Sequence, residues 1–284
     1  MSGSARPRAA VVGSMNTDLV VRCARLPRPG ETVLGGDVQR MAGGKGGNQA
    51  AALARLGVAT TVISCVGRDE NGQWLTSTLA DLGADTSLVQ HSQRPTGTAF
   101  ITVDDDGENE IVVSPGANAD LDLAHVDLDP FDLVLAQMEV PADIVDELAR
   151  RTSSLVLNVA PARRVAVATL VRCAVVIANE LESEHLVLGE LAHCVVTRGA
   201  RGAVHYSFGE VVAEAPAPVV EAVDTVGAGD VFCAAYASRY LAHDDPASAL
   251  RFAVTAGAMA TLAPGAQGSL PTTTEVHQWL EHAS

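Results

Sequence analysis

Residues 224–232 read DTVGAGDVF, a run in which small residues precede an aspartate and an apolar pair. An aspartate at a helix start usually caps the helix, because its carboxylate accepts hydrogen bonds from free backbone N–H groups. Gly227, Ala228 and Gly229 also predict another arrangement, in which the N–H groups at the helix start converge on an anion. A carboxylate beside an anion is electrostatically unfavourable unless it has a task, such as taking a proton from a hydroxyl group. We therefore interpret Asp230 as a general base rather than a cap.

A second glycine-rich stretch, GGKGGN at 43–48, contains the only lysine among the 19 Lys and Arg residues. An ammonium group is compact and enters a tight glycine loop more easily than a planar guanidinium group, which favours a functional role for Lys45. Neither stretch is a standard nucleotide-binding loop. Gly46 follows Lys45 where a P-loop needs Ser or Thr, and Phe232 ends GAGDVF where a dinucleotide fingerprint needs Gly or Ala.

Composition limits the classes of protein to consider. With 284 residues and 48% hydrophobic content, the chain can form one domain with a large core. A net charge of −15 without a basic tract argues against nucleic acid or anionic membrane as partner. No apolar run approaches the ~20 residues of a membrane span, and no signal peptide is recognisable. Five scattered cysteines without a CxxC pair argue against disulfides and zinc. We expect a soluble cytoplasmic protein.

Short apolar runs alternate with helical stretches along the chain. This alternation indicates an α/β fold of three layers, in which helices cover both faces of a mainly parallel central sheet. The expected strands are 9–13, 61–67, 133–138, 155–159, 174–178 and 193–197, and the expected helices end at Gly57 and Gly83, begin at Pro141, and cover 230–243 and 246–262.

Two segments depart from this alternation. Residues 96–113 read as two strands joined by an acidic turn with Gly107, which is typical of an antiparallel hairpin. Residues 31–43 also read as a strand. We expect these pieces to form a small sheet beside the main one, a β lid inserted from about 15–43 and 96–116.

Polar residues end or follow most of the predicted strands. Ligands of open parallel α/β sheets bind outside the carboxyl ends of the strands, so these residues would line one edge. Each alone is ordinary for a loop, but together they predict a ligand site. They are Asn16, Asp18, Glu139, Asn158, Asn179, Glu182 and Thr197.

Motifs along nearly the whole chain resemble those of the PfkB family of carbohydrate kinases. They are GSMNTD (13–18), PRPGETV (27–33), GGKGGNQAA (43–51), QMEVP (137–141), NVAPAR (158–163), NELE (179–182), TRGARG (197–202), DTVGAGD (224–230) and GAQGSLP (265–271). The first three are closest to the ribokinase branch of that family. The resemblance implies a single ribokinase-like domain over 1–284 and ATP-dependent phosphorylation of the 5-hydroxyl of D-ribose.

The resemblance also implies roles for individual residues. Asp230 would take the proton from the sugar hydroxyl, and Gly227, Ala228, Gly229 and Asp230 would form an anion hole for the transferred phosphoryl group. The residues that would hold the sugar are Asn16, Asp18, Gly44, Lys45, Asn48 and Glu139.

ATP with Mg²⁺ and an activating K⁺ are implied as cofactors, and the lid would build a homodimer. Glu182 would help to place Mg²⁺. The nucleotide would contact Asn179, Glu182, Thr197, Arg198, Gly199, Arg201, Gly202, Gly229 and Val254. The potassium ion would be held by Asp224, Val226, Ala260, Ala263, Gly265 and Ser269.

The chain departs from the family pattern on the nucleotide side. Only fourteen residues, 183–196, separate Glu182 from Thr197, where the family usually has a further helix. Arg198 stands where an apolar residue is usual, and Val254 where a polar neighbour of adenine is common. These departures affect nucleotide preference rather than phosphoryl transfer.

Two other functions remain open from the sequence. One is a related PfkB sugar or nucleoside kinase acting on deoxyribose, fructose or adenosine, because discrimination among these substrates depends on pocket shape. The other is a catalytically silent sugar-binding sensor. The presence of Asp230, the loop glycines and NELE argues against the sensor, which would be expected to lose its base first.

Overall fold

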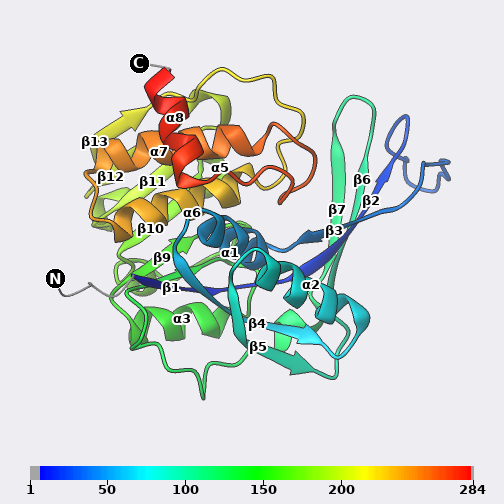
Figure 1. Cartoon of the computed structure of the whole chain (residues 1–284), viewed down its shortest axis with the longest axis horizontal. Helices are drawn as coiled ribbons and strands as arrows, with labels where there is room; N and C mark the ends of the chain where they lie inside the picture. Colours follow the sequence, from blue (N-terminus) through cyan, green and yellow to red (C-terminus); the bar gives the residue numbers. More distant parts are fainter. Residues whose placement is uncertain (1–6, 283–284) are drawn as a thin grey trace.

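The computed structural model describes residues 7–282 and has a nine-stranded sheet at its centre (Figure 1). Its strands are β1 (Arg8–Val12), β4 (Ala59–Gly67), β5 (Asp85–Ser92), β8 (Leu133–Ala136), β9 (Leu155–Asn158), β10 (Val175–Asn179), β11 (Cys194–Thr197), β12 (Ala203–Ser207) and β13 (Glu210–Ala215). The order across the sheet is β13-β12-β11-β10-β9-β8-β1-β4-β5. All neighbours from β11 to β5 pair in parallel, whereas β12 and β13 are antiparallel.

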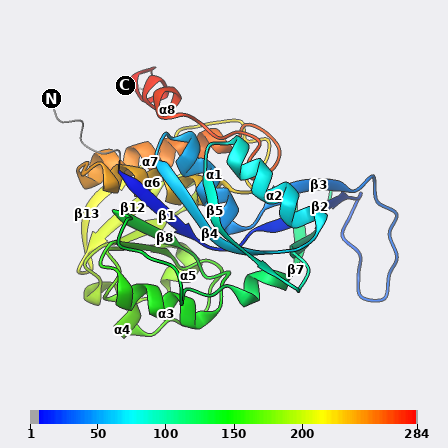
Figure 2. The ribbon, with the colours of Figure 1, turned by 60° about the horizontal axis from the view of Figure 1, so that its bottom comes forward.

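Helices cover both faces of this sheet. On one face lie α1 (Lys45–Arg55), α2 (Glu70–Asp81), α6 (Ala228–Leu241), α7 (Pro246–Ala260) and α8 (Thr273–His282), and on the other lie α3 (Ala142–Arg151) and α4 (Val167–Leu170) (Figure 2). Alternate strand residues contact the two layers: Ala9 and Val11 join the first core cluster, and Ala10 and Val12 the second. Burial on both faces explains the continuous apolar strands and confirms the predicted fold class.

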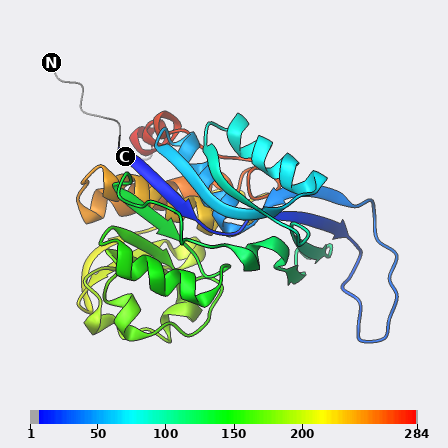
Figure 3. The ribbon, with the colours of Figure 1, turned by 90° about the horizontal axis from the view of Figure 1, so that it is seen from below.

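A second sheet of four strands stands beside the main one (Figures 1 and 3). Its order is β3-β2-β6-β7, with β2 (Asn16–Arg22), β3 (Gln39–Gly43), β6 (Gly97–Val103) and β7 (Asn109–Ser114). The antiparallel pairing of β6 with β7 confirms the predicted hairpin, whose turn is closed by a 3.1 Å bond from the Gly107 amide to the Asp104 carbonyl.

The strand predicted over 31–43 is correct only for its last part. The antiparallel pairing with β2 extends only from Asn16–Gly43 to Val20–Gln39, so residues 31–38 have no continuous strand beside them. An isolated bridge between Gly35 and Cys23 is their only ladder contact among the described residues. This stretch therefore forms a long irregular loop beyond the small sheet (Figure 3).

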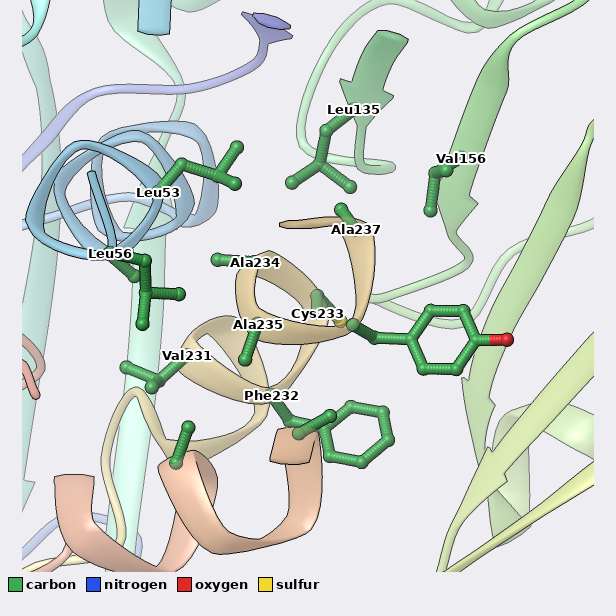
Figure 4. Close-up of a cluster of buried hydrophobic side chains, with 14 of the residues drawn as sticks. Leu53, Leu56, Leu135, Val156, Val231, Phe232, Cys233, Ala234, Ala235 and Ala237 are labelled. Carbon is green, nitrogen blue, oxygen red and sulfur yellow. The ribbon is translucent and has the colours of Figure 1, made fainter. Parts of the chain in front are cut away.

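Helix α6 is buried along most of its length, because it packs between α1, α7 and the sheet (Figure 4). Small side chains such as Ala234, Ala235 and Ala237 allow this close approach. The helix begins after Gly227, whose φ of +80° is typical of glycine. A Cβ atom at Gly227 would lie 2.6 Å from the Cα atom of Ala266. The start of α6 is thus fixed against the loop that contains Ala266.

The five cysteines, Cys23, Cys65, Cys173, Cys194 and Cys233, are all buried and unpaired. Over residues 7–282, no helix is both long and apolar enough to cross a membrane.

Candidate active site

The carboxyl ends of the parallel strands bring the predicted polar residues to one edge of the main sheet. In the pairing of β1 with β8, Val12 lies beside Ala136, so the segments that contain Asn16 and Glu139 leave the sheet next to each other. At the neighbouring strands, Asn158 ends β9 and Asn179 pairs with Thr197. The expected line of polar groups along this edge is therefore present.

Asp230 lies in the first turn of α6, and its carboxylate is buried. One oxygen, Oδ2, accepts a hydrogen bond from Asn48 Nδ2 (2.9 Å), and Oδ1 accepts one from Gln49 Nε2 (3.0 Å). Burial raises the pKa of Asp230, while the charge of Lys45 and the two amides oppose that rise. Gly227 caps the helix without any side-chain bond, so Asp230 is not a helix cap.

Lys45 is the first residue of α1 and lies among carboxylates. Glu139 Oε2 accepts hydrogen bonds from the Lys45 backbone amide (3.1 Å) and from the Ser14 hydroxyl (2.5 Å). The pKa of the Lys45 ammonium is raised, first by the charge of Asp230 and then, against the effect of burial, by Glu139. A cation at a helix N-terminus is unfavourable, and these carboxylates compensate for it. Gly44, with φ +83°, lets α1 start close to β2.

Asn16 and Asp18 lie on β2, the strand of the small sheet that follows β1 in the chain, so the small sheet contributes them to the site. Burial, followed by the charges of Glu139 and Asp230, raises the pKa of Asp18 to about 7. The Asp18 carboxylate occupies the space above Gly43, where a Cβ atom would lie 2.1 Å from Oδ2. The glycine before Gly44 in the motif is therefore needed to accommodate Asp18.

The start of α6 leaves backbone donors for an anion. The N–H groups of Gly229 and Asp230 belong to the first turn, where no intrahelical carbonyl can accept them. A Cβ atom at Gly229 would meet no heavy atom within 4 Å, so the space beside this residue is open. The first turn of α6 therefore combines the open space at Gly229, the free N–H groups of Gly229 and Asp230, and the buried carboxylate of Asp230.

Asn179 and Glu182 form a capping box around the single turn α5 (Glu180–Ser183). Glu182 Oε2 accepts a hydrogen bond from the Asn179 amide (2.8 Å), and Asn179 Oδ1 accepts one from the Glu182 amide (2.8 Å). The NxxE spacing is therefore explained by the capping box. The box uses only Oε2 of Glu182, so Oε1 is left for another partner. Glu182 also contributes to the raised pKa of Lys45, so its charge acts across the site on the first turn of α1.

The predicted nucleotide residues 197–202 form the turn between β11 and β12, with the short 3₁₀ helix η3 (Gly199–Arg201). Arg198 pairs with Glu214 (3.1 Å), and Arg201 pairs with Glu180. Both guanidinium groups are thus tied to neighbouring elements.

The backbone of the same turn explains why glycines stand at positions 199 and 202. Gly199 has φ +55°, and a Cβ atom at Gly202 would lie 1.9 Å from the Ala215 carbonyl oxygen. The Thr197 hydroxyl donates to the Ala178 carbonyl (3.4 Å), and Val254 is buried on α7. Between the end of α5 and the start of β11 at Cys194, segment 183–196 contains only the 3₁₀ turn η2 (Leu188–Glu190) and no further helix, in agreement with its short length.

The residues expected around potassium come from two loops that Asp224 ties together. Its Oδ1 accepts a hydrogen bond from the Val226 amide (3.0 Å), and its Oδ2 accepts one from the Gly265 amide (2.8 Å). Helix α7 ends at Ala260, and the amides of Thr261 and Leu262 donate to the carbonyls of Ala258 and Met259. Ser269 is bound to the Met259 carbonyl (3.0 Å). Carbonyl, hydroxyl and carboxylate oxygens are suitable ligands for a hard cation.

Several residues of the site were not singled out from the sequence. Asn118, in the 3₁₀ helix η1 (Gly116–Asp120), accepts from the Met15 amide (2.9 Å) and donates to Asn16 Oδ1 (2.8 Å). Gln267 donates to Asn48 Oδ1 (3.2 Å). Gln49 follows Asn48 within GGKGGNQAA, so the motif contained a signal for it, but Asn118 stands in no motif.

Comparison with known proteins identifies the family. The model of the pfkB family carbohydrate kinases matches residues 6–273. The chain belongs to the PfkB family of carbohydrate kinases. This carbohydrate kinase is 37% identical to the ribokinase of Bacillus subtilis over an alignment of 289 positions, which covers 95% of the chain and 98% of that relative.

Solved structures agree with this membership. The ribokinase of Thermotoga maritima superposes on this kinase with a TM-score of 0.89 at 31% identity, covering 96% of this chain and 99% of the other. The ribokinase of Arabidopsis thaliana complexed with ribose and ATP gives a TM-score of 0.88 at 28% identity, with 98% and 99% covered. The ribokinase-like three-layer fold and the family resemblance are both confirmed.

Proposed function

We propose that this kinase is an ATP-dependent ribokinase that phosphorylates the primary 5-hydroxyl of D-ribose. The observation that carries the proposal is the buried carboxylate of Asp230, held by two amides in the first turn of α6 beside the open space at Gly229. The choice of ribose is supported by the similarity to the ribokinases of Bacillus subtilis and Thermotoga maritima, and by the ribose and ATP in the complex of the Arabidopsis protein.

In the proposed reaction, Asp230 takes the proton of the sugar hydroxyl as the oxygen attacks the γ-phosphorus atom. A bond forms between this oxygen and phosphorus, and the bond from phosphorus to the β-phosphate oxygen breaks, so that ADP leaves. The free amides of Gly229 and Asp230, together with Gly227 and Ala228, would stabilise the charge on the transferred phosphoryl group. The raised pKa of Asp230 makes its carboxylate a better proton acceptor.

Sugar hydroxyls both donate and accept hydrogen bonds, so a mixture of carboxylates, amides and an ammonium group is suited to bind them. The residues that we assign to the sugar are Asn16, Asp18, Gly44, Lys45, Asn48 and Glu139. Asn48 has one amide hydrogen bound to Asp230 and a second one left for a hydroxyl. Asp18 would accept from a sugar hydroxyl.

We place ATP along Asn179, Glu182, 197–202 and Val254, with its γ-phosphate toward Gly229. Mg²⁺ usually binds through one or two carboxylates and the phosphates rather than in a protein cage. Two observations are in keeping with this mode. Glu182 has one carboxylate oxygen outside its capping bond, and residues 7–282 contain no cluster of three or more His, Cys, Asp or Glu side chains suited to a metal. Bound Mg²⁺ would neutralise phosphate charge.

We also propose that K⁺ activates the enzyme through the paired loops. Asp224, Val226, Ala260, Ala263, Gly265 and Ser269 would supply the oxygens. Because the loop with Val226 leads directly into Gly227, a cation there would favour the geometry of the anion hole.

The small sheet would act as a lid and as the interface of a homodimer. Its edge strand β7 is exposed throughout, and Phe100 on β6 lies directly opposite the exposed Val112. An apolar pair on an open edge is a common site of association. Size-exclusion chromatography with light scattering should give a dimer for the wild type and a monomer for Val112→Glu.

A reducing cytoplasm is the compartment that we propose. All five cysteines are buried and unpaired, as is usual for proteins that fold without disulfides.

The deciding assay measures ADP release with ATP, Mg²⁺ and one candidate acceptor at a time, with and without K⁺. We expect the highest kcat/KM with D-ribose and a clear loss of rate without K⁺. Higher activity with deoxyribose, fructose or adenosine would correct the substrate but keep the kinase. Sugar binding by calorimetry without turnover of any acceptor would favour the sensor.

A further inference from the structure

Gln49 is fully buried on α1 and contacts the predicted base directly. Its Nε2 atom donates to Asp230 Oδ1 (3.0 Å) and to Asn158 Oδ1 (3.3 Å), and its Oε1 atom accepts from Gln137 Nε2 (2.6 Å). The side-chain amide thus has a partner on both its nitrogen and its oxygen.

The partners of Gln49 fix which way its amide points. Asn158 Nδ2 donates to the Ile177 carbonyl (3.2 Å), so Asn158 must turn its oxygen toward Gln49. Gln137 turns its amide nitrogen toward Gln49 Oε1. If the Gln49 amide were reversed, its oxygen would face the oxygens of Asp230 and Asn158, which accept hydrogen bonds in this arrangement and do not donate them. The chain of amides therefore permits one orientation, with the N–H groups toward Asp230.

The hydrogen-bonded amides of Gln49, Asn158 and Gln137 connect Asp230 to the central sheet. Asn158 ends β9, Ile177 lies on the adjacent β10, and Gln137 follows β8 directly. Gln137 and Gln49 are both fully buried, and Gln137 Oε1 has no hydrogen-bond partner, so the pair carries a cost that an apolar pair would avoid. A core position next to a helix packed on the sheet would be filled more simply by an apolar residue. The retained amides therefore suggest a task beyond packing.

We propose that Gln49 is a positioning residue of the phosphoryl transfer, which locks the carboxylate of Asp230 in one orientation relative to the sugar hydroxyl. The inference rests on the proposed role of Asp230 as base. Asn48 holds the other carboxylate oxygen, so the two neighbouring side chains of α1 grip both oxygens. Without Gln49 the carboxylate could rotate about its last side-chain bond, and fewer bound sugars would be attacked in a productive geometry.

Loss of the Gln49 donor should also change the ionisation of the base. The charged and titratable groups around Asp230 are Lys45 on α1, Glu139 after β8, Asp18 on β2 and Cys233 on α6. The Gln49 hydrogen bond lowers the pKa of Asp230 against the effect of burial. Without it, the pKa rises, and the acid limb of the kcat profile moves to higher pH.

The test compares Gln49→Met with the wild type and with Thr169→Val. Methionine matches the length of glutamine but donates no hydrogen bond. Thr169 is the matched control, because its buried hydroxyl also donates to a carboxylate, that of Asp146 (2.6 Å), but lies between α4 and α3, away from the site. We expect Gln49→Met to lower kcat about 10- to 100-fold, the loss of one charge-assisted bond, with KM for the sugar changed less than threefold. Thr169→Val should keep the wild-type kcat and pH profile.

The inference would be overturned if Gln49→Met lost stability to the same extent as Thr169→Val but kept the kcat and the acid limb of the wild type. If Gln49→Met does not fold, the variant Gln137→Met takes its place in the test. This variant removes the hydrogen bond to Gln49 Oε1, so the Gln49 amide is held less firmly, but Gln49 can still donate to Asp230. It should lower kcat severalfold without moving the acid limb, and an unchanged kcat would overturn the proposal. All rates are measured with whichever sugar the wild type phosphorylates, so failure with ribose contradicts the proposed substrate and leaves this test intact.

Discussion

At the scale of single residues, the proposed sugar side of the site concentrates like charges. The ammonium of Lys45 interacts with the carboxylates of Glu139 and Asp230, and these two carboxylates also act on Asp18. Such a cluster lowers the stability of the empty protein and becomes favourable when hydroxyl groups bind to it. The arrangement predicts opposite effects of one substitution on stability and on binding.

Asp18→Asn should stabilise the sugar-free protein at high pH. Because the folded-state pKa of Asp18 is about 7 instead of 3.8, its favourable contribution is complete below pH 4 and is lost as pH rises through 7. Asparagine has no such loss, so the Tm difference between the variant and the wild type should grow between pH 4.5 and 8. Thermal scans at both values measure it, and a pH-independent difference would contradict the raised pKa. Affinity for the sugar should fall in the same variant.

Lys45→Arg should be poorly tolerated although it keeps the charge. Gly44 and Gly46 lie in close contact with the segment between β1 and β2, so the backbone on both sides of Lys45 has little freedom to move. The planar guanidinium needs more room and spreads its charge over a fork. We expect a clear rise in KM for the sugar or a clear fall in kcat. Steady-state kinetics within twofold of wild type in both would mean that the lone lysine is incidental.

At the scale of elements, two glycines at the start of α6 should respond differently to the same methyl group. Gly227 has φ +80° and no room, whereas Gly229 has ordinary helical geometry and open space. Gly227→Ala should therefore lower Tm by several degrees. Gly229→Ala should keep Tm, because alanine favours helix, but lower kcat/KM roughly 10²–10³-fold by filling the anion space. Equal loss of stability in both variants, with equal activity, would contradict the assigned anion hole.

The sequence was most informative where an element has a regular pattern. Buried parallel strands were predicted to within a few residues, because burial on both faces leaves an apolar run such as 133–138. The strand predicted over 31–38 was wrong, since the pairing with β2 stops at Gln39 and only an isolated bridge, between Gly35 and Cys23, follows it. The hairpin of β12 and β13 and helix α8 were not expected, because their half-exposed sequences lack a strong pattern.

The same limit applies to the site. Glycine-rich motifs identified Lys45, Asn48 and Asp230, because their spacing carries chemical meaning. The contact between Gln49 and Asp230 joins residues 181 apart in the chain, and no local pattern encodes it. Asn118 likewise acts on Asn16 from 102 residues away.

At the scale of the whole molecule, the proposed nucleotide side is built from short elements. Segment 183–196 contributes the last residue of α5, the 3₁₀ turn η2 and the first residues of β11, and the buried Val254 offers no hydrogen bond to a base. An adenine held by apolar contacts is distinguished weakly from guanine, since strong selectivity needs paired buried polar groups. We expect kcat/KM for GTP within about tenfold of that for ATP, and KM for ATP above KM for the sugar. A preference for ATP beyond a thousandfold would show that backbone groups read the base.

We propose that the sheet edge and α6 bring the buried carboxylate of Asp230 to the sugar hydroxyl, and that this carboxylate takes the proton. Turnover by Asp230→Asn tests it most directly, with sugar affinity from calorimetry and Tm as controls for binding and folding. We predict near wild-type affinity and Tm, with kcat reduced roughly 10²–10⁴-fold, the usual contribution of a general base. A purified, folded variant that phosphorylates the sugar at close to the wild-type rate would contradict the role of Asp230.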